Sequence, residues 1–202
     1  MRAIVISLAC LATAACDSPT EQAPSQPVAA VPTIEPTIEP IVEPTIKAAE
    51  LPTLSVSGMG IGLAKNNETQ PFDFGASRGE VDEALSAVLG VEPEKTANEE
   101  CGAGPMEFSN YRGSFTASFQ DDTFVGWFLD GADFDMILSG KGIAIGDPIE
   151  IFAELHTANS DEESTLGAEW YSETDGIGAF AAPSEDGEVV ESMYAGANCF
   201  FR

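Results

Sequence analysis

Basic residues are scarce in this chain, and their scarcity limits its partners. Lys and Arg together number 8 among 202 residues, whereas Asp and Glu number 34, and the formal net charge is −26. Binding to a nucleic-acid backbone or to anionic lipid headgroups requires clustered positive charge, so we expect neither. A strongly acidic surface keeps a protein soluble through self-repulsion, and it also suits a cationic partner or a divalent metal.

Residue patterns of familiar catalytic and cofactor sites are also missing. The chain has a single histidine, His156, and it has no G-x-S-x-G elbow and no acidic loop with calcium-site spacing. Gly58, Gly60 and Gly62 do not continue into a dinucleotide-binding fingerprint, because position 63 is Leu and no helix start follows. We therefore expect no cofactor, and we interpret His156 as a helix-end residue stabilised by the helix dipole.

The apolar run at the start of the chain is too short to be a permanent membrane span. Residues 3–11 form this run, whereas a spanning helix needs roughly 20 residues. Arg2 precedes the run and small residues follow it at positions 12–15, which is the layout of a secretory signal peptide. The pattern predicts a signal peptide over residues 1–15 and an exported protein.

The end of this leader resembles a known processing site. Ala14-Ala15-Cys16 is similar to a bacterial lipobox, although Thr13 stands where Leu is usual. The resemblance covers the first 16 residues and implies that Cys16 carries a lipid, which would anchor the protein to a membrane of the bacterial cell envelope, facing the periplasm or the exterior. The alternative is ordinary cleavage near positions 12–14, which leaves a soluble periplasmic protein.

A proline-rich segment separates Cys16 from the folded part. Pro32, Pro36, Pro40 and Pro44 recur every four residues within a stretch rich in Glu, Thr and Ala. Proline lacks a backbone N–H and clashes with the preceding helical turn, so this spacing excludes a helix. We expect residues 16–50 to be a lipidated cysteine followed by a disordered Pro/Glu-rich tether.

Residues 51–202 carry the signals of a folded domain. Ser77 with Glu80 predicts a capped helix that ends at Gly90, and Asp147 as N-cap with Pro148 at the first helical position predicts a second helix. Alternating or apolar segments predict strands. These segments are 53–64, 112–120, 123–129, 165–171, 176–182 and 188–201.

The two halves of this domain share a weak pattern. Ile143-Ala144-Ile145-Gly146 echoes Phe72-Asp73-Phe74-Gly75 at an offset of 71, although two coincidental apolar starts are the alternative. We expect an α+β fold of two layers, a tandem duplication of a short helix followed by an antiparallel β-meander, with subunits at about 51–135 and 136–202. The unit resembles small bacterial envelope lipoproteins of the SmpA/OmlA type, and doubled it resembles the β-lactamase-inhibitor-protein architecture, which implies a binding role.

Two cysteines remain outside the leader and the lipid site. Cys101 and Cys199 allow one pairing, and an oxidising compartment favours a disulfide between them. A catalytic thiol or a pair of metal ligands is the alternative, but His156 shows no link to either cysteine.

These features favour a non-catalytic envelope lipoprotein whose sheet or sheet edge binds a protein partner. The candidate contact residues are aromatics, and packing in the core is the alternative for each of them. They are Trp127, Trp170, Tyr171 and Tyr194. An envelope hydrolase that uses carboxylates or a bound divalent metal, and a purely structural component, stay open as further hypotheses.

Overall fold

A computed structural model describes residues 54–65, 68–112, 115–131 and 137–200. The chain divides into the units Met1–Ile46 and Lys47–Arg202, and all described residues belong to the second. The expected signal peptide, Cys16 and the tether lie outside the described residues. Among the described helices, none has the length and apolar character needed to cross a membrane.

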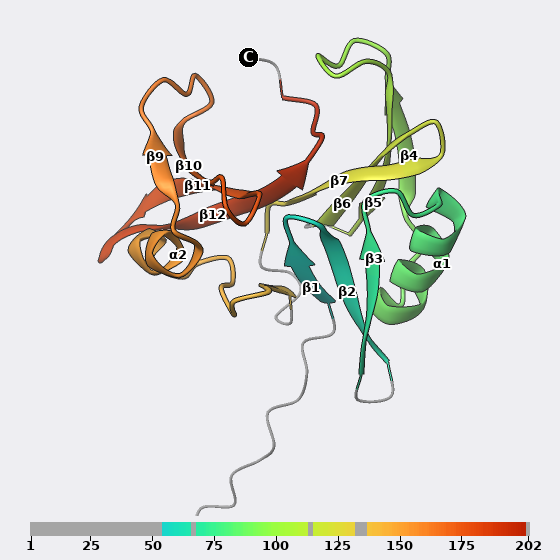
Figure 1. The fold of residues 1–202 in the computed structure, drawn as a ribbon, viewed down its shortest axis with the longest axis horizontal. Coiled ribbons are helices and arrows are strands. Elements are labelled where there is room, and N and C mark those ends of the chain that lie inside the picture. Colours follow the sequence, from blue (N-terminus) through green and yellow to red (C-terminus); the bar gives the residue numbers. More distant parts are fainter. Residues whose placement is uncertain (1–53, 66–67, 113–114, 132–136, 201–202) are drawn as a thin grey trace, which may run out of the picture. The chain divides into compact units, whose positions relative to one another are not determined.

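Two β-sheets form most of this unit (Figure 1). The larger has eight strands in the order β4-β5-β6-β7-β12-β11-β10-β9, and the smaller has four in the order β3-β2-β1-β8. The strands are β1 Leu54–Ser57, β2 Gly60–Lys65, β3 Glu68–Asp73, β4 Glu94–Asn98, β5 Met106–Tyr111, β6 Phe115–Gln120, β7 Thr123–Leu129, β8 Ile137–Ser139, β9 Asn159–Asp161, β10 Ala168–Ser172, β11 Ile177–Ser184 and β12 Gly187–Gly196.

The predicted α+β fold of tandem helix-plus-meander units is wrong. Of the described residues, 51% lie in strands and 15% in two helices, so the fold is mostly β. The four-stranded sheet spans both predicted units, because β8 of the second unit pairs in parallel with β1 of the first. Sequence periodicity missed β3, β4, β5, β8 and β9. Of these, β3 and β4 are polar strands at sheet edges, where backbone hydrogen bonds rather than buried side chains define the strand.

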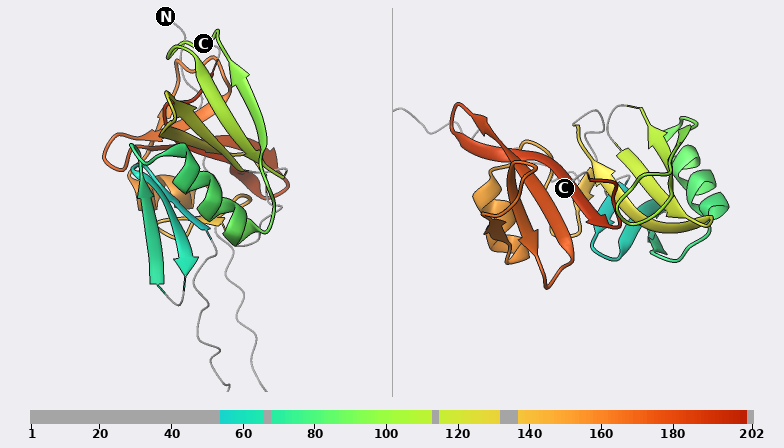
Figure 2. Two further views of the ribbon diagram at one scale, coloured as in Figure 1. Left: turned by 90° about the vertical axis from the view of Figure 1, so that its right-hand side faces the viewer. Right: turned by 90° about the horizontal axis from the view of Figure 1, so that it is seen from above.

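The first helix forms as the sequence predicts. Helix α1 spans Arg78–Leu89, and the Ser77 side chain accepts a hydrogen bond from the backbone N–H of Glu80 at 3.4 Å. Gly90 ends the helix in the left-handed conformation, with φ 68°, which glycine adopts without steric cost. The helix contacts β2 and β7, and Figure 2 shows it beside the β2–β3 hairpin.

The second helix begins one residue later than predicted. Helix α2 spans Ile149–His156 with Pro148, not Asp147, at the N-cap. The Asp147 carboxylate accepts the backbone N–H of Ala144 at 2.8 Å instead, and the Asp147 carbonyl accepts from Val190 of β12. Pairing with a distant strand therefore holds Asp147 extended, and this tertiary contact overrides the local capping signal.

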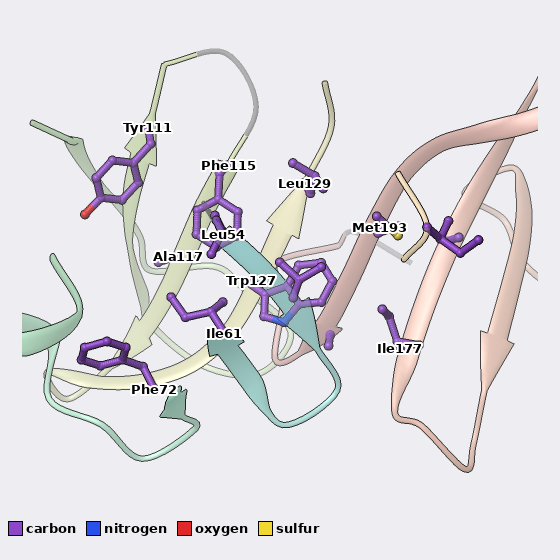
Figure 3. Packing of buried hydrophobic residues seen from close by; sticks show 14 of the residues in the cluster. Leu54, Ile61, Phe72, Tyr111, Phe115, Ala117, Trp127, Leu129, Ile177 and Met193 are labelled. Carbon is purple, nitrogen blue, oxygen red and sulfur yellow. The ribbon is translucent and has the colours of Figure 1, made fainter. Parts of the chain in front are cut away.

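One hydrophobic core lies between the sheets and the helices (Figure 3). Trp127 of β7 and Ala195 of β12 are register partners on the core face of the larger sheet, next to Leu129 and Met193. Leu54 and other residues of the smaller sheet complete the same cluster. Both described helices bury residues there, so neither of them covers the opposite face of β7 and β10–β12, which we call the helix-free face.

The predicted disulfide between Cys101 and Cys199 is confirmed. It links the connection after β4 to the segment after β12, across 98 positions of the chain. In the chain-entropy picture, cross-linking so long a loop removes roughly 4–5 kcal/mol of entropic freedom from the unfolded state. The disulfide also holds the C-terminal segment against the helix-free face, where Phe200 contacts residues of the larger sheet.

Candidate functional site

Strand register places a row of aromatic side chains on the helix-free face of the larger sheet. Tyr194 of β12 is opposite Phe128 of β7 on one side and Gly178 of β11 on the other, and Gly178 is opposite Tyr171 of β10. Since alternate residues of a strand point to opposite faces, this row lies opposite the core face that holds Met193. Two of the four aromatics predicted as contact residues therefore share this face.

These aromatics form one continuous cluster around Phe200. The rings of Tyr171 and Tyr194 stack at 6.3 Å between centroids, and Phe180 stacks on Tyr194 at 5.5 Å. The Phe200 ring packs edge-on against Tyr194, Phe180 and Phe128 at 5.1 to 5.7 Å. Tyr171 is 39% exposed, so the cluster reaches solvent at β10. We call Phe128, Tyr171, Phe180, Tyr194 and Phe200 the aromatic cluster.

A buried carboxylate on the same face of the sheet orients the cluster. Glu169 of β10 is 2% exposed and accepts hydrogen bonds from the hydroxyls of Tyr194 and of Ser164, the latter at 2.5 Å. Charge-assisted hydrogen bonds of this kind are stronger and more directional than neutral ones. They hold the Tyr194 ring in one position on the sheet, where Tyr194 and Phe180 are buried and support the exposed ring of Tyr171.

A groove of about 270 Å³ adjoins the cluster. Phe180 and Phe200 form its aromatic walls, and Glu191 is a charged side chain among its lining residues. Its lining consists of Leu166, Gly167, Ala168, Phe180, Ala181, Glu191, Ser192 and Phe200. This volume lies below the roughly 300–1,000 Å³ of sites for drug-sized molecules, and it suits a single side chain of a partner.

The two tryptophans predicted as contact residues are not on this face. Trp127 is fully buried, and its indole N–H donates to the Ser57 carbonyl at 2.8 Å, so the core-packing alternative holds for it. Trp170 packs against the hydrophobic core from the other face of β10. The sequence did not predict Phe128, Phe180 and Phe200 as contact residues. For Phe200 a signal existed, because the predicted disulfide holds the preceding residue, Cys199, against the folded domain.

The single histidine lies in a buried polar cluster. His156 ends α2 and is 3% exposed. Its Nδ1 lies 2.8 Å from Asp175 Oδ2, and its Nε2 lies 3.0 Å from the Ser139 hydroxyl. Lys141 Nζ contacts the same Asp175 oxygen at 2.5 Å and donates to the Leu155 carbonyl at 2.8 Å. The predicted dipole interaction is not the main role of His156, because two side chains hold both ring nitrogens.

Electrostatics keep His156 neutral and Asp175 ionised. Burial lowers the pKa of His156, although the hydrogen bond to Asp175 partly opposes this shift. The hydrogen bond from Lys141 lowers the pKa of Asp175, and His156 adds to the same effect. We assign the proton of the neutral imidazole to Nδ1, which donates to the carboxylate, so that Nε2 accepts from the Ser139 hydroxyl.

Ser139, His156 and Asp175 have the connectivity of a catalytic triad but not its accessibility. The Ser139 oxygen accepts backbone N–H groups of Lys141 at 3.3 Å and Ile143 at 3.1 Å, so both of its lone pairs are occupied. Ser139 is 2% exposed, and none of the three residues lines the described grooves. The cluster joins β8, α2 and the β10–β11 turn, which is a structural role.

Neither of two other grooves shows a chemical site. One of about 260 Å³ lies between α1 and the β2–β3 hairpin and is mostly apolar. The other, of about 370 Å³, has four carboxylates in its lining, of which Glu107 pairs with Arg78 at 3.0 Å. No group of three or more His, Cys, Asp or Glu residues suited to hold a metal occurs within the ranges that the structure describes.

Comparison of the chain with protein-family models, with curated proteins and with solved structures finds no match.

Proposed function

We propose that this chain is an exported, lipid-anchored protein of the bacterial cell envelope that binds a protein partner without catalysing a reaction. Cys16 carries the lipid, and the tether of residues 16–50 holds the folded domain away from the membrane, facing the periplasm or the exterior. The binding surface is the aromatic cluster together with the 270 Å³ groove beside it.

The aromatic cluster carries this proposal. Interface cores are enriched in Tyr, Phe and Trp, and an exposed aromatic surface that continues into a groove is a typical contact site. Here Tyr171 is exposed at 39% and stacks on Tyr194, which Glu169 holds in place. A preformed surface loses little conformational entropy on binding, which favours recognition of a folded or extended partner.

Binding is favoured over catalysis by a serine or cysteine nucleophile by the chemistry of the buried cluster and of the disulfide. A hydrolase that uses carboxylates or a bound divalent metal is a separate alternative. A serine nucleophile needs a free lone pair and access to substrate. The Ser139 oxygen accepts two backbone N–H groups and is buried, and the disulfide occupies Cys101 and Cys199. Ser139, Cys101 and Cys199 are therefore already committed to structural contacts.

The anchor is tested by mass spectrometry of the mature N-terminus. We expect an acylated Cys16 at the first position, and we expect a Cys16→Ser variant to leave the membrane fraction. An unmodified N-terminus created by cleavage near positions 12–14 would contradict lipidation while leaving export intact.

The binding surface is tested by affinity capture with the full chain from an envelope extract, using paired variants. We expect Tyr171→Ala to reduce recovery of the bound protein at least fivefold. Leu155→Ala is the matched control, because Leu155 is 43% exposed on α2, away from the aromatic cluster. Equal recovery with both variants would place the binding surface elsewhere or show that the captured protein is nonspecific.

A further inference from the structure

The lining of the groove beside the aromatic cluster combines apolar surface with one carboxylate. Leu166, Phe180 and Phe200 contribute apolar and aromatic surface, whereas Glu191 contributes a carboxylate. Its volume of about 270 Å³ is below that of sites for drug-sized molecules. The volume therefore suits one apolar side chain of a partner, and the Glu191 carboxylate lies in the same lining.

Glu191 has this position because β12 carries a β-bulge. Phe180 pairs with Ser192 and Ala181 pairs with Val190, so Glu191 is the extra residue between these two pairs. A bulge re-aims the side chain of its extra residue, and bulges are common near binding sites. Among the described residues, Glu191 makes no ion pair, so its charge is available at the groove.

The charge around the groove has one sign. Between positions 137 and 200 the chain contains 13 Asp and Glu residues, and Lys141 is the single Lys or Arg. Lys141 is already paired with Asp175. Three of these acids, at positions 161–163, directly precede the loop that contributes Leu166 to the groove. A negative surface raises the local concentration of cationic partners and repels acidic ones.

We propose that the groove binds a basic segment of the partner protein, with one apolar side chain of the segment packed against Phe180 and Phe200 and a flanking Lys or Arg on Glu191. This inference rests on the proposed function and specifies the chemistry of the partner. The apolar contact supplies most of the affinity, and the acidic surroundings select for positive charge.

Short peptides of defined charge test this inference. Three probes are titrated into the full chain, held in a mild non-ionic detergent, by isothermal calorimetry: acetyl-Lys-Arg-Leu-Lys-Arg-amide, the same peptide with Gly in place of Leu, and acetyl-Glu-Asp-Leu-Glu-Asp-amide. We expect the basic Leu peptide to bind about tenfold more tightly than its Gly counterpart, because the buried Leu side chain is lost. We expect no measurable binding of the acidic peptide, and weaker binding of the basic one as salt is raised to 0.5 M.

Two charge variants locate the contact. Glu191→Gln is expected to weaken binding of the basic Leu peptide about threefold to tenfold. Glu188→Gln removes a charge from the same strand outside the groove lining and is expected to change affinity less than twofold.

The outcomes separate this inference from the function on which it rests. Binding of the acidic Leu peptide, or equal effects of the two Glu variants, would overturn the basic-segment proposal while a Tyr171-dependent capture still supports a binding domain. If no peptide binds and Tyr171→Ala leaves capture unchanged, both proposals fail.

Discussion

The ring of Tyr194 lies directly over the backbone of Gly178. A Cβ added at Gly178 would be 2.2 Å from Tyr194 Cζ, far inside any real contact. Because Gly178 has no side chain, Tyr194 of β12 reaches across β11 and stacks on Tyr171 of β10 at 6.3 Å. An aromatic residue that covers a glycine in a sheet is a known stabilising device, and here it also builds the candidate binding surface.

We therefore expect Gly178→Ala to disrupt both stability and the aromatic cluster. Steric overlap in a packed region typically lowers the free energy of unfolding by about 1–3 kcal/mol, which urea titration measures. Gly79→Ala is the matched control, since a Cβ at Gly79 meets nothing within 4 Å. Gly79 lies in α1, where Ala exceeds Gly by up to about 1 kcal/mol in helix propensity, so this variant is expected to be neutral or stabilising. Destabilisation by both variants to the same extent would contradict the steric explanation.

The buried imidazole of His156 gives the fold a pH dependence. Burial lowers the pKa of His156 below its usual 6.5, so the unfolded chain binds a proton at a higher pH than the folded one. The contribution to stability is complete above pH 6.5 and is lost as the pH falls towards the folded-state pKa, by at most about 1.4 kcal/mol per pH unit. We expect urea midpoints to fall between pH 7.5 and pH 5.5.

The variant His156→Gln isolates this effect. The variant is expected to have a lower free energy of unfolding at pH 7.5, because the buried hydrogen bonds of the imidazole to Asp175 and Ser139 are disrupted. It is also expected to show a shallower pH dependence between 7.5 and 5.5. The lowered pKa of Asp175 acts in a separate window, since that stabilisation is lost only as the pH falls below about 4. An unchanged slope in the His156 variant would assign the pH dependence to other groups.

Removing the disulfide tests the position of Phe200. The double variant Cys101→Ser, Cys199→Ser is expected to lose roughly 4–5 kcal/mol of unfolding free energy, the chain-entropy estimate for a loop of this length. Phe200 directly follows Cys199 and forms a wall of the groove, so peptide binding is expected to weaken in the same variant. Wild type treated with dithiothreitol provides the control and should match the double variant in both measurements. Unchanged affinity after reduction would show that the aromatic contacts alone hold Phe200.

Two buried serines give a paired test of hydrogen bonding. Ser118 of β6 is 1% exposed, and its hydroxyl oxygen has no hydrogen-bond partner among the described residues. Ser118→Ala removes a desolvated polar group, so we expect a gain of up to about 1 kcal/mol in the free energy of unfolding. Ser139→Ala is the same chemical change, but it leaves His156 and two backbone N–H groups without their partner. We expect Ser139→Ala to lower the free energy of unfolding by about 1–3 kcal/mol. Equal effects of the two substitutions in urea titrations would contradict this account.

Local signals in the sequence were sufficient for some elements. The Ser77–Glu80 pair and Gly90 predict the start and end of α1, and both predictions are confirmed. Asp121 and Asp122 predict the turn between β6 and β7, and both adopt the positive φ values that a two-residue hairpin turn requires. Such features depend on neighbouring residues alone, so the printed sequence contains them.

The larger arrangement depends on contacts between distant residues. Periodicity predicted two repeated units, but the smaller sheet takes β8 from the second predicted unit as a parallel partner of β1, a pairing that no local pattern encodes. His156 likewise meets Ser139 and Asp175, which lie 17 and 19 positions away, and no motif marks either of them.

The sequence by itself determined the acidity of the chain, the first helix, the β6–β7 turn and the pairing of Cys101 with Cys199. Tertiary structure alone decided that Tyr171, Tyr194 and Phe200 meet on one face, because strand register and the glycine at position 178 set which side chains become neighbours. The physical reason is that capping, turns and charge depend on local chemistry, whereas a binding surface depends on which strands pair.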